Sequence, residues 1–137
     1  MVRRWGPSIA LLVGACAFAA FGRFLSAALF LFAAFLLSPR AFPSSVTDAQ
    51  ARAASARDGR PIVYWRPGCP FCLRLRVTVG RNAGRLHWVD IWADPAGAAS
   101  VRGVTGGDET VPTVVTTSGS HVNPSPDVVR GLLQSPR

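Results

Sequence analysis

The stretch that decides the fold is residues 62–72, which reads Ile62-Val63-Tyr64-Trp65-Arg66-Pro67-Gly68-Cys69-Pro70-Phe71-Cys72. Its first four residues are β-branched or aromatic and favour a strand. Proline and glycine then mark a loop, and two cysteines separated by two residues follow it. This order predicts a thiol pair directly after a strand, and the chemistry of the protein is expected there.

The segment after the cysteine pair carries two conflicting signals. Between Leu73 and Val79 every second residue is apolar, a period typical of a strand. Thiol chemistry favours a helix instead, because a cysteine attacks a disulfide as a thiolate and a helix N-terminus lowers its pKa. Pro70 suits the first turn of a helix, where its missing N–H is not needed. We therefore expect a helix with Cys69 at its N-cap, and Cys72 one turn later can close a disulfide to it.

The other elements of this part are predicted from their patterns. Pro112 precedes a β-rich run, where proline cannot be an ordinary central strand residue, so a cis peptide bond at Val111–Pro112 is expected. Strands alternating with helices indicate an α/β sandwich. The expected strands are 62–65, 86–91 and 112–116, and the expected helices after the cysteine pair are 95–103 and 126–133.

The length and charge of the chain exclude some classes of protein. With 137 residues it is too short for a large multidomain enzyme. All fifteen basic residues are arginines, and seven acids leave a net charge of +8. After residue 41 the arginines are interspersed with the acids and no recognition motif accompanies them, so nucleic acid is not an expected partner.

Residues 1–41 have the composition of a membrane anchor. Residues 9–21 are all apolar or glycine, and Ser26 is the one polar residue in 24–37. We predict two short transmembrane helices joined at Gly22-Arg23, because this arrangement keeps Arg23 out of the bilayer core. A single longer helix and a cleaved signal peptide are the alternatives.

The cysteine pair admits other interpretations than redox catalysis. A zinc site needs four ligands, and only His87 and His121 accompany the pair in the later part of the chain. An iron–sulfur cluster would need ligands from two chains. A purely structural disulfide across so small a loop would contribute little stability. We therefore expect redox chemistry and no metal, with a metal-delivery or assembly module as the competing class.

Together these residues resemble the glutaredoxins, and within them the mycoredoxins of actinobacteria. The resemblance spans about residues 61–133. It implies a thioredoxin-like three-layer sandwich with a mixed central sheet. The motifs that carry it are Cys69-Pro70-Phe71-Cys72 with Leu73-Arg74-Leu75, Val89-Asp90-Ile91, Gly106-Gly107, Thr110-Val111-Pro112-Thr113-Val114 and Asn123-Pro124-Ser125.

The resemblance also implies an activity. It implies an oxidoreductase that reduces protein disulfides, or mixed disulfides between proteins and a small thiol, with no bound cofactor. Asn123-Pro124 stands where glutathione-dependent members have a Gly-Gly pair, so mycothiol is expected as co-substrate rather than glutathione.

The roles implied for single residues follow the family's motifs. Cys69 is the nucleophile, Cys72 the resolving thiol and partner in a redox disulfide, and Pro112 the cis-proline of the catalytic site. The expected substrate-binding residues are Trp65, Phe71, Thr110, Val111, Asn123 and Pro124.

The expected organisation has three parts. Residues 1–41 form the anchor, 42–58 a juxtamembrane linker with a helix at 47–57, and 59–137 the glutaredoxin-like domain. The expected location is the bacterial inner membrane, with lipid head groups near the linker arginines and the catalytic domain in the cytoplasm. An extracytoplasmic thiol oxidase or isomerase is the alternative if only one helix crosses the membrane.

Overall fold

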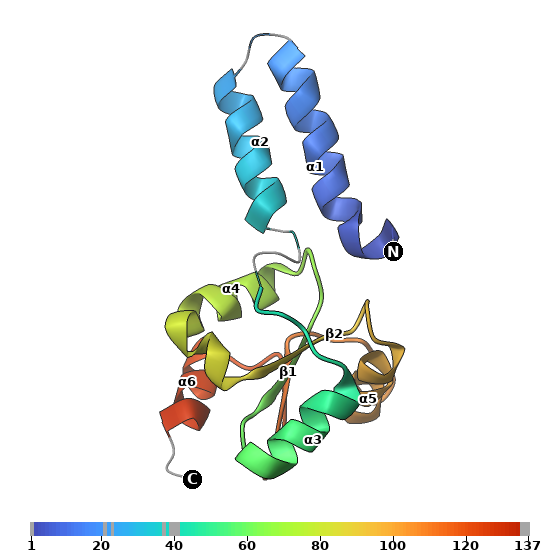
Figure 1. Ribbon diagram of the computed structural model, residues 1–137, viewed down its shortest axis with the longest axis vertical. Helices are drawn as coiled ribbons and strands as arrows, with labels where there is room; N and C mark the ends of the chain where they lie inside the picture. Colours follow the sequence, from blue (N-terminus) through green and yellow to red (C-terminus); the bar gives the residue numbers. More distant parts are fainter. Residues whose placement is uncertain (1, 21, 23, 37, 39–41, 135–137) are drawn as a thin grey trace.

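The computed structural model describes residues 2–20, 22, 24–36, 38 and 42–134 (Figure 1). Two helices come first, and an α/β domain follows them. The elements are α1 (Val2–Ala20), α2 (Phe24–Leu36), α3 (Asp48–Asp58), β1 (Ile62–Trp65), α4 (Pro70–Val79), the 3₁₀ helix η2 (Gly80–Arg85), β2 (His87–Asp90), α5 (Pro95–Thr105), β3 (Thr113–Thr116), β4 (Gly119–Val122) and α6 (Pro126–Gln134).

The described strands form one mixed sheet in the order β2-β1-β3-β4. β1 and β2 are parallel, in a register that pairs Trp65 with Asp90. β1 and β3 are antiparallel, as are β3 and β4. All four residues of β1 are buried, as expected for a strand with a neighbour on each side and helices on both faces. The sheet therefore holds β1 at its centre, with the cysteine pair directly after it.

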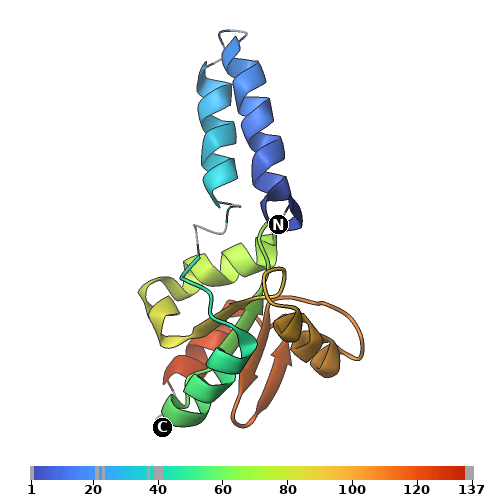
Figure 2. The same ribbon diagram turned by 45° about the vertical axis from the view of Figure 1, so that its right-hand side comes forward.

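The helices cover the sheet from both sides. α3 packs against α5 on one face, and α4 packs against α6 on the other (Figures 1 and 2). Helices on both faces of a mixed sheet give three layers. This is a thioredoxin-like α/β fold, and the predicted fold class of the domain is confirmed.

The linker before α3 is part of the packed domain. The ring of Phe42 stacks on Trp65 with centroids 3.9 Å apart, and it meets Trp88 edge-on at 5.9 Å. The Val46 amide donates to the Trp88 carbonyl at 2.9 Å. Phe42 and Ala51 both belong to the hydrophobic core. The core thus extends well before residue 59, where the sequence suggested that the domain begins.

α4 resolves the conflict between period and chemistry in favour of the helix. Its N-cap is Cys69 and proline occupies its first turn, as predicted. Cys72, Leu75 and Val79 are buried at helical spacing. Val77, one of the alternating apolar residues, is 67% exposed. The alternation in the sequence therefore arose because residues of the buried helical face and the exposed Val77 are all apolar.

β4 is a strand that the sequence patterns did not predict. It forms a hairpin with β3, in a register that pairs Thr113 with Val122. Its residues Gly-Ser-His-Val are mostly exposed, so they lack the apolar alternation that marks a half-buried strand. The Ser118-Gly119 dipeptide, a common turn signal, was the available clue.

α1 and α2 lie side by side and extend away from the α/β domain (Figures 1 and 2). Small residues make the close approach possible, since a Cβ atom at Gly14 would lie 3.2 Å from the Phe30 ring. Ala15, Ala27 and Ala34 are buried. Arg23, which we expected in the turn between two transmembrane helices, lies outside the described residues.

The predicted membrane location is wrong. In the part of the chain that the structure describes, no helix combines the length and the apolar character needed to cross a membrane. α2 has 13 residues, whereas a span needs about 20. α1 has 19 residues, but its first turns contain arginines and other residues of low hydrophobicity. The expectation of lipid partners rested on the same anchor.

Two glycines in α5 allow a matched test of the packing between this helix and the sheet. A Cβ at Gly97 would lie 2.7 Å from Cγ1 of the buried Val89, whereas a Cβ at Gly103 would meet nothing within 4 Å. Gly97→Ala should lower the free energy of unfolding by about 1–3 kcal/mol through overpacking. Gly103→Ala should raise it by up to about 1 kcal/mol, because alanine is the better helix former. Urea unfolding of both variants measures these changes, and equal effects would contradict this packing.

Candidate active site

The cysteine pair lies where β1 ends and α4 begins. Cys69 has extended backbone angles (φ −87°, ψ 113°) and serves as N-cap, so its sulfur can face the unpaired amides of the first turn. The Cys72 amide donates to the Cys69 Sγ at 3.3 Å. Both cysteines are free thiols in this structure. The helix terminus therefore provides hydrogen-bond donors to the sulfur that is to react.

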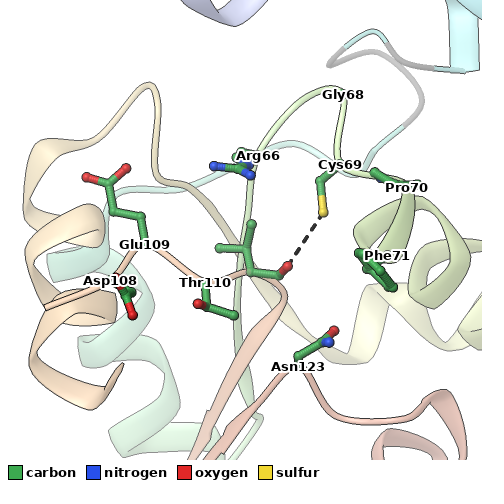
Figure 3. A pocket seen from close by; sticks show the side chains of 10 residues that line it. Arg66, Gly68, Cys69, Pro70, Phe71, Asp108, Glu109, Thr110 and Asn123 are labelled. Carbon is green, nitrogen blue, oxygen red and sulfur yellow. Dashed lines mark hydrogen bonds between the residues drawn. The ribbon is translucent and has the colours of Figure 1, made fainter. Parts of the chain in front are cut away.

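The start of β3 forms the opposite side of the site. The Val111–Pro112 peptide bond is cis, as predicted. When protonated, the Cys69 thiol donates to the Val111 carbonyl at 3.5 Å, and Figure 3 shows this contact. The Asn123 amide donates to the Pro112 carbonyl at 2.8 Å, which connects the segment after β4 to the same turn. Three loops that are far apart in sequence thus meet at the cavity beside Cys69.

A cavity of about 450 Å³ opens beside this sulfur (Figure 3). A smaller cavity of about 200 Å³ adjoins it, and Phe71 and Asn123 line both. Phe71 is 57% exposed, so its ring is available to a substrate. The other residues of the larger cavity are Arg66, Gly68, Cys69, Pro70, Asp108, Glu109, Thr110 and Val111, and those of the smaller are Arg74, Leu75, Pro124, Ser125 and Pro126.

The two thiols have opposite electrostatic environments. A hydrogen bond from the Cys72 thiol, backbone amides of Cys72 and Phe71 and the charge of Arg66 outweigh burial and lower the pKa of Cys69 to about 6. The same hydrogen bond and burial raise the pKa of Cys72 above its ordinary value. At neutral pH Cys69 is therefore the thiolate and Cys72 remains a protonated thiol.

The structure brings most of the expected binding residues together. Phe71, Thr110, Val111 and Asn123 line the cavity beside Cys69, and Pro124 lines the smaller cavity that adjoins it.

Trp65 does not line the cleft, which corrects its predicted role as a substrate-binding residue. Its side chain is 0% exposed because the ring of Phe42 covers it. Its indole N–H donates to the Ser45 hydroxyl at 3.0 Å. Trp65 is a core residue, and the linker that buries it was not expected to belong to the domain.

Two acidic residues of the cavity were not predicted. Asp108 and Glu109 form part of its wall, and Figure 3 shows Glu109 on the side of the cavity toward Arg66. The Glu109 carboxylate accepts a hydrogen bond from Arg102 at 2.7 Å. The available clue to this role was their position directly before Thr110, because the residue type alone does not distinguish them from other surface acids.

Within the described ranges, no group of three or more His, Cys, Asp or Glu side chains is placed to hold a metal ion.

A low-pKa cysteine at a helix N-terminus opposite a cis-proline, on this sheet, defines a thiol–disulfide exchange domain of the thioredoxin type. Comparison with known proteins makes the assignment more specific. Residues 62–122 match the glutaredoxin family. Two Mycobacterium tuberculosis proteins provisionally named glutaredoxins, from strains CDC 1551 and H37Rv, are each 40% identical over 72 residues, which is 52% of this chain and 86% of each relative. The chain belongs to the glutaredoxin family, and it is a thiol–disulfide oxidoreductase.

The pKa of Cys69 can be tested by alkylation. In a Cys16→Ser background, which removes the exposed third thiol, the iodoacetamide rate should rise with pH to half its maximum near pH 6, because only the thiolate reacts. Cys72→Ala should move this midpoint to higher pH, since it removes the thiol donor. Cys72→Ser retains a hydroxyl donor and should shift it less. An unchanged midpoint in Cys72→Ala would contradict the role of this hydrogen bond.

Proposed function

We propose that this protein reduces mixed disulfides between proteins and a low-molecular-weight thiol, with Cys69 as the nucleophile. The observation that carries the proposal is the difference between the two thiols. Cys69 is a thiolate at neutral pH and lies at the wall of a cavity, whereas Cys72 is fully buried and its pKa is raised. A single reactive sulfur beside a cavity suits exchange with one small thiol at a time.

The reaction proceeds by two thiol exchanges. The Cys69 thiolate attacks the small thiol's sulfur in the mixed disulfide, and the target protein leaves as a thiolate. Cys69 is then joined by a disulfide to the small thiol. The thiolate of a second small-thiol molecule attacks the sulfur of the bound one, which releases the oxidised small thiol and restores the Cys69 thiolate. No other oxidant or reductant is needed.

Cys72 provides a side path in this mechanism. Its sulfur can attack Cys69 in the mixed disulfide, which releases the small thiol and forms the Cys69–Cys72 disulfide. The raised pKa of Cys72 keeps the fraction of thiolate small, so this step is slow while Cys72 stays buried. The same intramolecular disulfide would serve the reduction of protein disulfides.

Mycothiol is the co-substrate we propose, and the backbone after β4 supports it. The Asn123 amide is already bonded to the Pro112 carbonyl, and Pro124 has no amide hydrogen. Neither residue offers a backbone N–H to a carboxylate, which a Gly-Gly pair would provide to glutathione. A sugar thiol does not depend on such donors. The resemblance to mycoredoxins at Asn123-Pro124-Ser125 and the mycobacterial relatives agree with this choice.

Turnover of a mixed disulfide tests the proposed reaction. The full chain with Cys16→Ser and Cys72→Ser should reduce a peptide disulfide of mycothiol at a rate comparable to that of Cys16→Ser alone, since the principal path needs only Cys69. Cys69→Ser should be inactive. Loss of activity in the Cys72→Ser variant, with the parent active on protein disulfides, would show that dithiol chemistry is the main reaction.

The choice of small thiol has its own test. The double substitution Asn123→Gly and Pro124→Gly adds an amide donor, and glycine accepts the positive φ of 46° at position 123. A hydrogen bond to a charged group should raise kcat/KM for the glutathione disulfide about tenfold relative to that for mycothiol. Pro43→Gly, in the linker before α3, is the control and should leave the ratio unchanged. A parent protein that prefers glutathione would refute the assignment of mycothiol.

A further inference from the structure

Among the described residues that line the cavity beside Cys69, Arg66 is the one basic residue. It follows β1 directly, and in Figure 3 its side chain lies between Cys69 and Glu109. Its charge contributes to the low pKa of the Cys69 thiol. An arginine on a loop can adopt many rotamers. Its charge therefore acts steadily on the Cys69 sulfur only if another residue restricts the position of the guanidinium.

Trp92 is placed to provide that restraint. The guanidinium carbon of Arg66 lies 5.6 Å from the centroid of the Trp92 ring, within the range of a cation–π interaction. The contact follows from the sheet, because β1 and β2 are parallel and their carboxyl ends are adjacent. The Ile91 amide donates to the Trp65 carbonyl at 3.0 Å, which extends the pairing to the residues just before Trp92 and Arg66.

The turn that carries Trp92 is itself held by hydrogen bonds. The Trp92 backbone amide donates a hydrogen bond to the Asp90 carboxylate at 2.9 Å. The amides of Ala93 and Asp94 both donate to the Asp90 carbonyl at 3.0 Å. Asp90 is 1% exposed, and Trp92 packs against the hydrophobic core. The aromatic face is therefore presented to Arg66 from a fixed support.

We infer that Trp92 is a positioning residue: its ring holds the Arg66 guanidinium at the cavity wall beside Cys69, where the charge favours the reacting thiolate. The effect on turnover rests on the proposed function, whereas the effect on the thiolate does not. Asp108 and Glu109 line the same wall, so an unrestrained Arg66 would have acidic partners to move toward. Glu109 is bonded to Arg102 at 2.7 Å, which offsets part of that attraction.

The test is a double-mutant cycle on the full chain in the Cys16→Ser background. Trp92→Leu keeps apolar bulk and removes the aromatic face, so Cys69 alkylation by iodoacetamide at pH 5 should slow about two- to fivefold. Trp92→Phe should retain most of the parent rate. In an Arg66→Met background, Trp92→Leu should not lower the alkylation rate further. Arg74→Met is the matched control, because it removes an arginine charge from the smaller cavity. In that background Trp92→Leu should lower the alkylation rate as much as it does in the parent.

Two outcomes would overturn the inference. One is an equal effect of Trp92→Leu with and without Arg66, which would show a merely structural role. The other is no effect of Trp92→Leu in the parent. If Trp92→Leu does not fold, fluorinated tryptophans can be placed at position 92 instead. They keep the ring size but reduce the negative potential of the ring face, which weakens the cation–π interaction. The alkylation rate should then fall with each added fluorine. A flat series would equally refute the inference.

Alkylation needs no disulfide substrate, so this test is separate from that of the proposed function. If mycothiol turnover fails and the cycle succeeds, Trp92 still positions Arg66, but the small thiol was misassigned. If both succeed, kcat/KM for the mixed disulfide at pH 5 should fall in Trp92→Leu by the same factor as the alkylation rate.

Discussion

The pairing of β1 with a parallel β2 and an antiparallel β3 is the constraint on which the site depends. Because β2 runs with β1, the turn after β2 lies beside the loop after β1. Because β3 runs against β1, its first residues reach the same edge of the sheet. Strand direction therefore places Cys69, Trp92 and Val111 at the same edge of the sheet. A change in the direction of either neighbour would separate the reactive sulfur from the residues around it.

At that edge of the sheet, the chemistry depends on the different environments of two cysteine side chains, Cys69 and Cys72. Cys69 caps α4 and receives donors from the backbone and from the Cys72 thiol, which lowers its pKa. Cys72 lies one turn further, buried and acting as the donor, which raises its pKa. A hydrogen bond between the two sulfurs moves both values in the directions that separate a nucleophile from a resolving thiol. Arg66 adds a positive charge on the cavity side.

Three elements show which structural features the local sequence patterns predict and which they do not. α4 was predicted correctly because the chemical need for a helix N-terminus at Cys69 outweighed an alternation that suggested a strand. β4 was missed because an exposed edge strand has no apolar face to give it a period. The membrane anchor was a wrong prediction, because an apolar composition at residues 9–37 does not fix the length of each helix.

The sequence by itself determined the local features: the strand at residues 62–65, the helix that Cys69 begins and the cis bond before Pro112. Each depends on residues close together in the chain, where propensity, proline geometry and cysteine spacing act directly. Only the tertiary structure decided that Phe42 buries Trp65, that Asp108 and Glu109 line the cavity and that Trp92 faces Arg66. These contacts join distant segments, and their geometry is set by sheet register and packing, which no local pattern encodes.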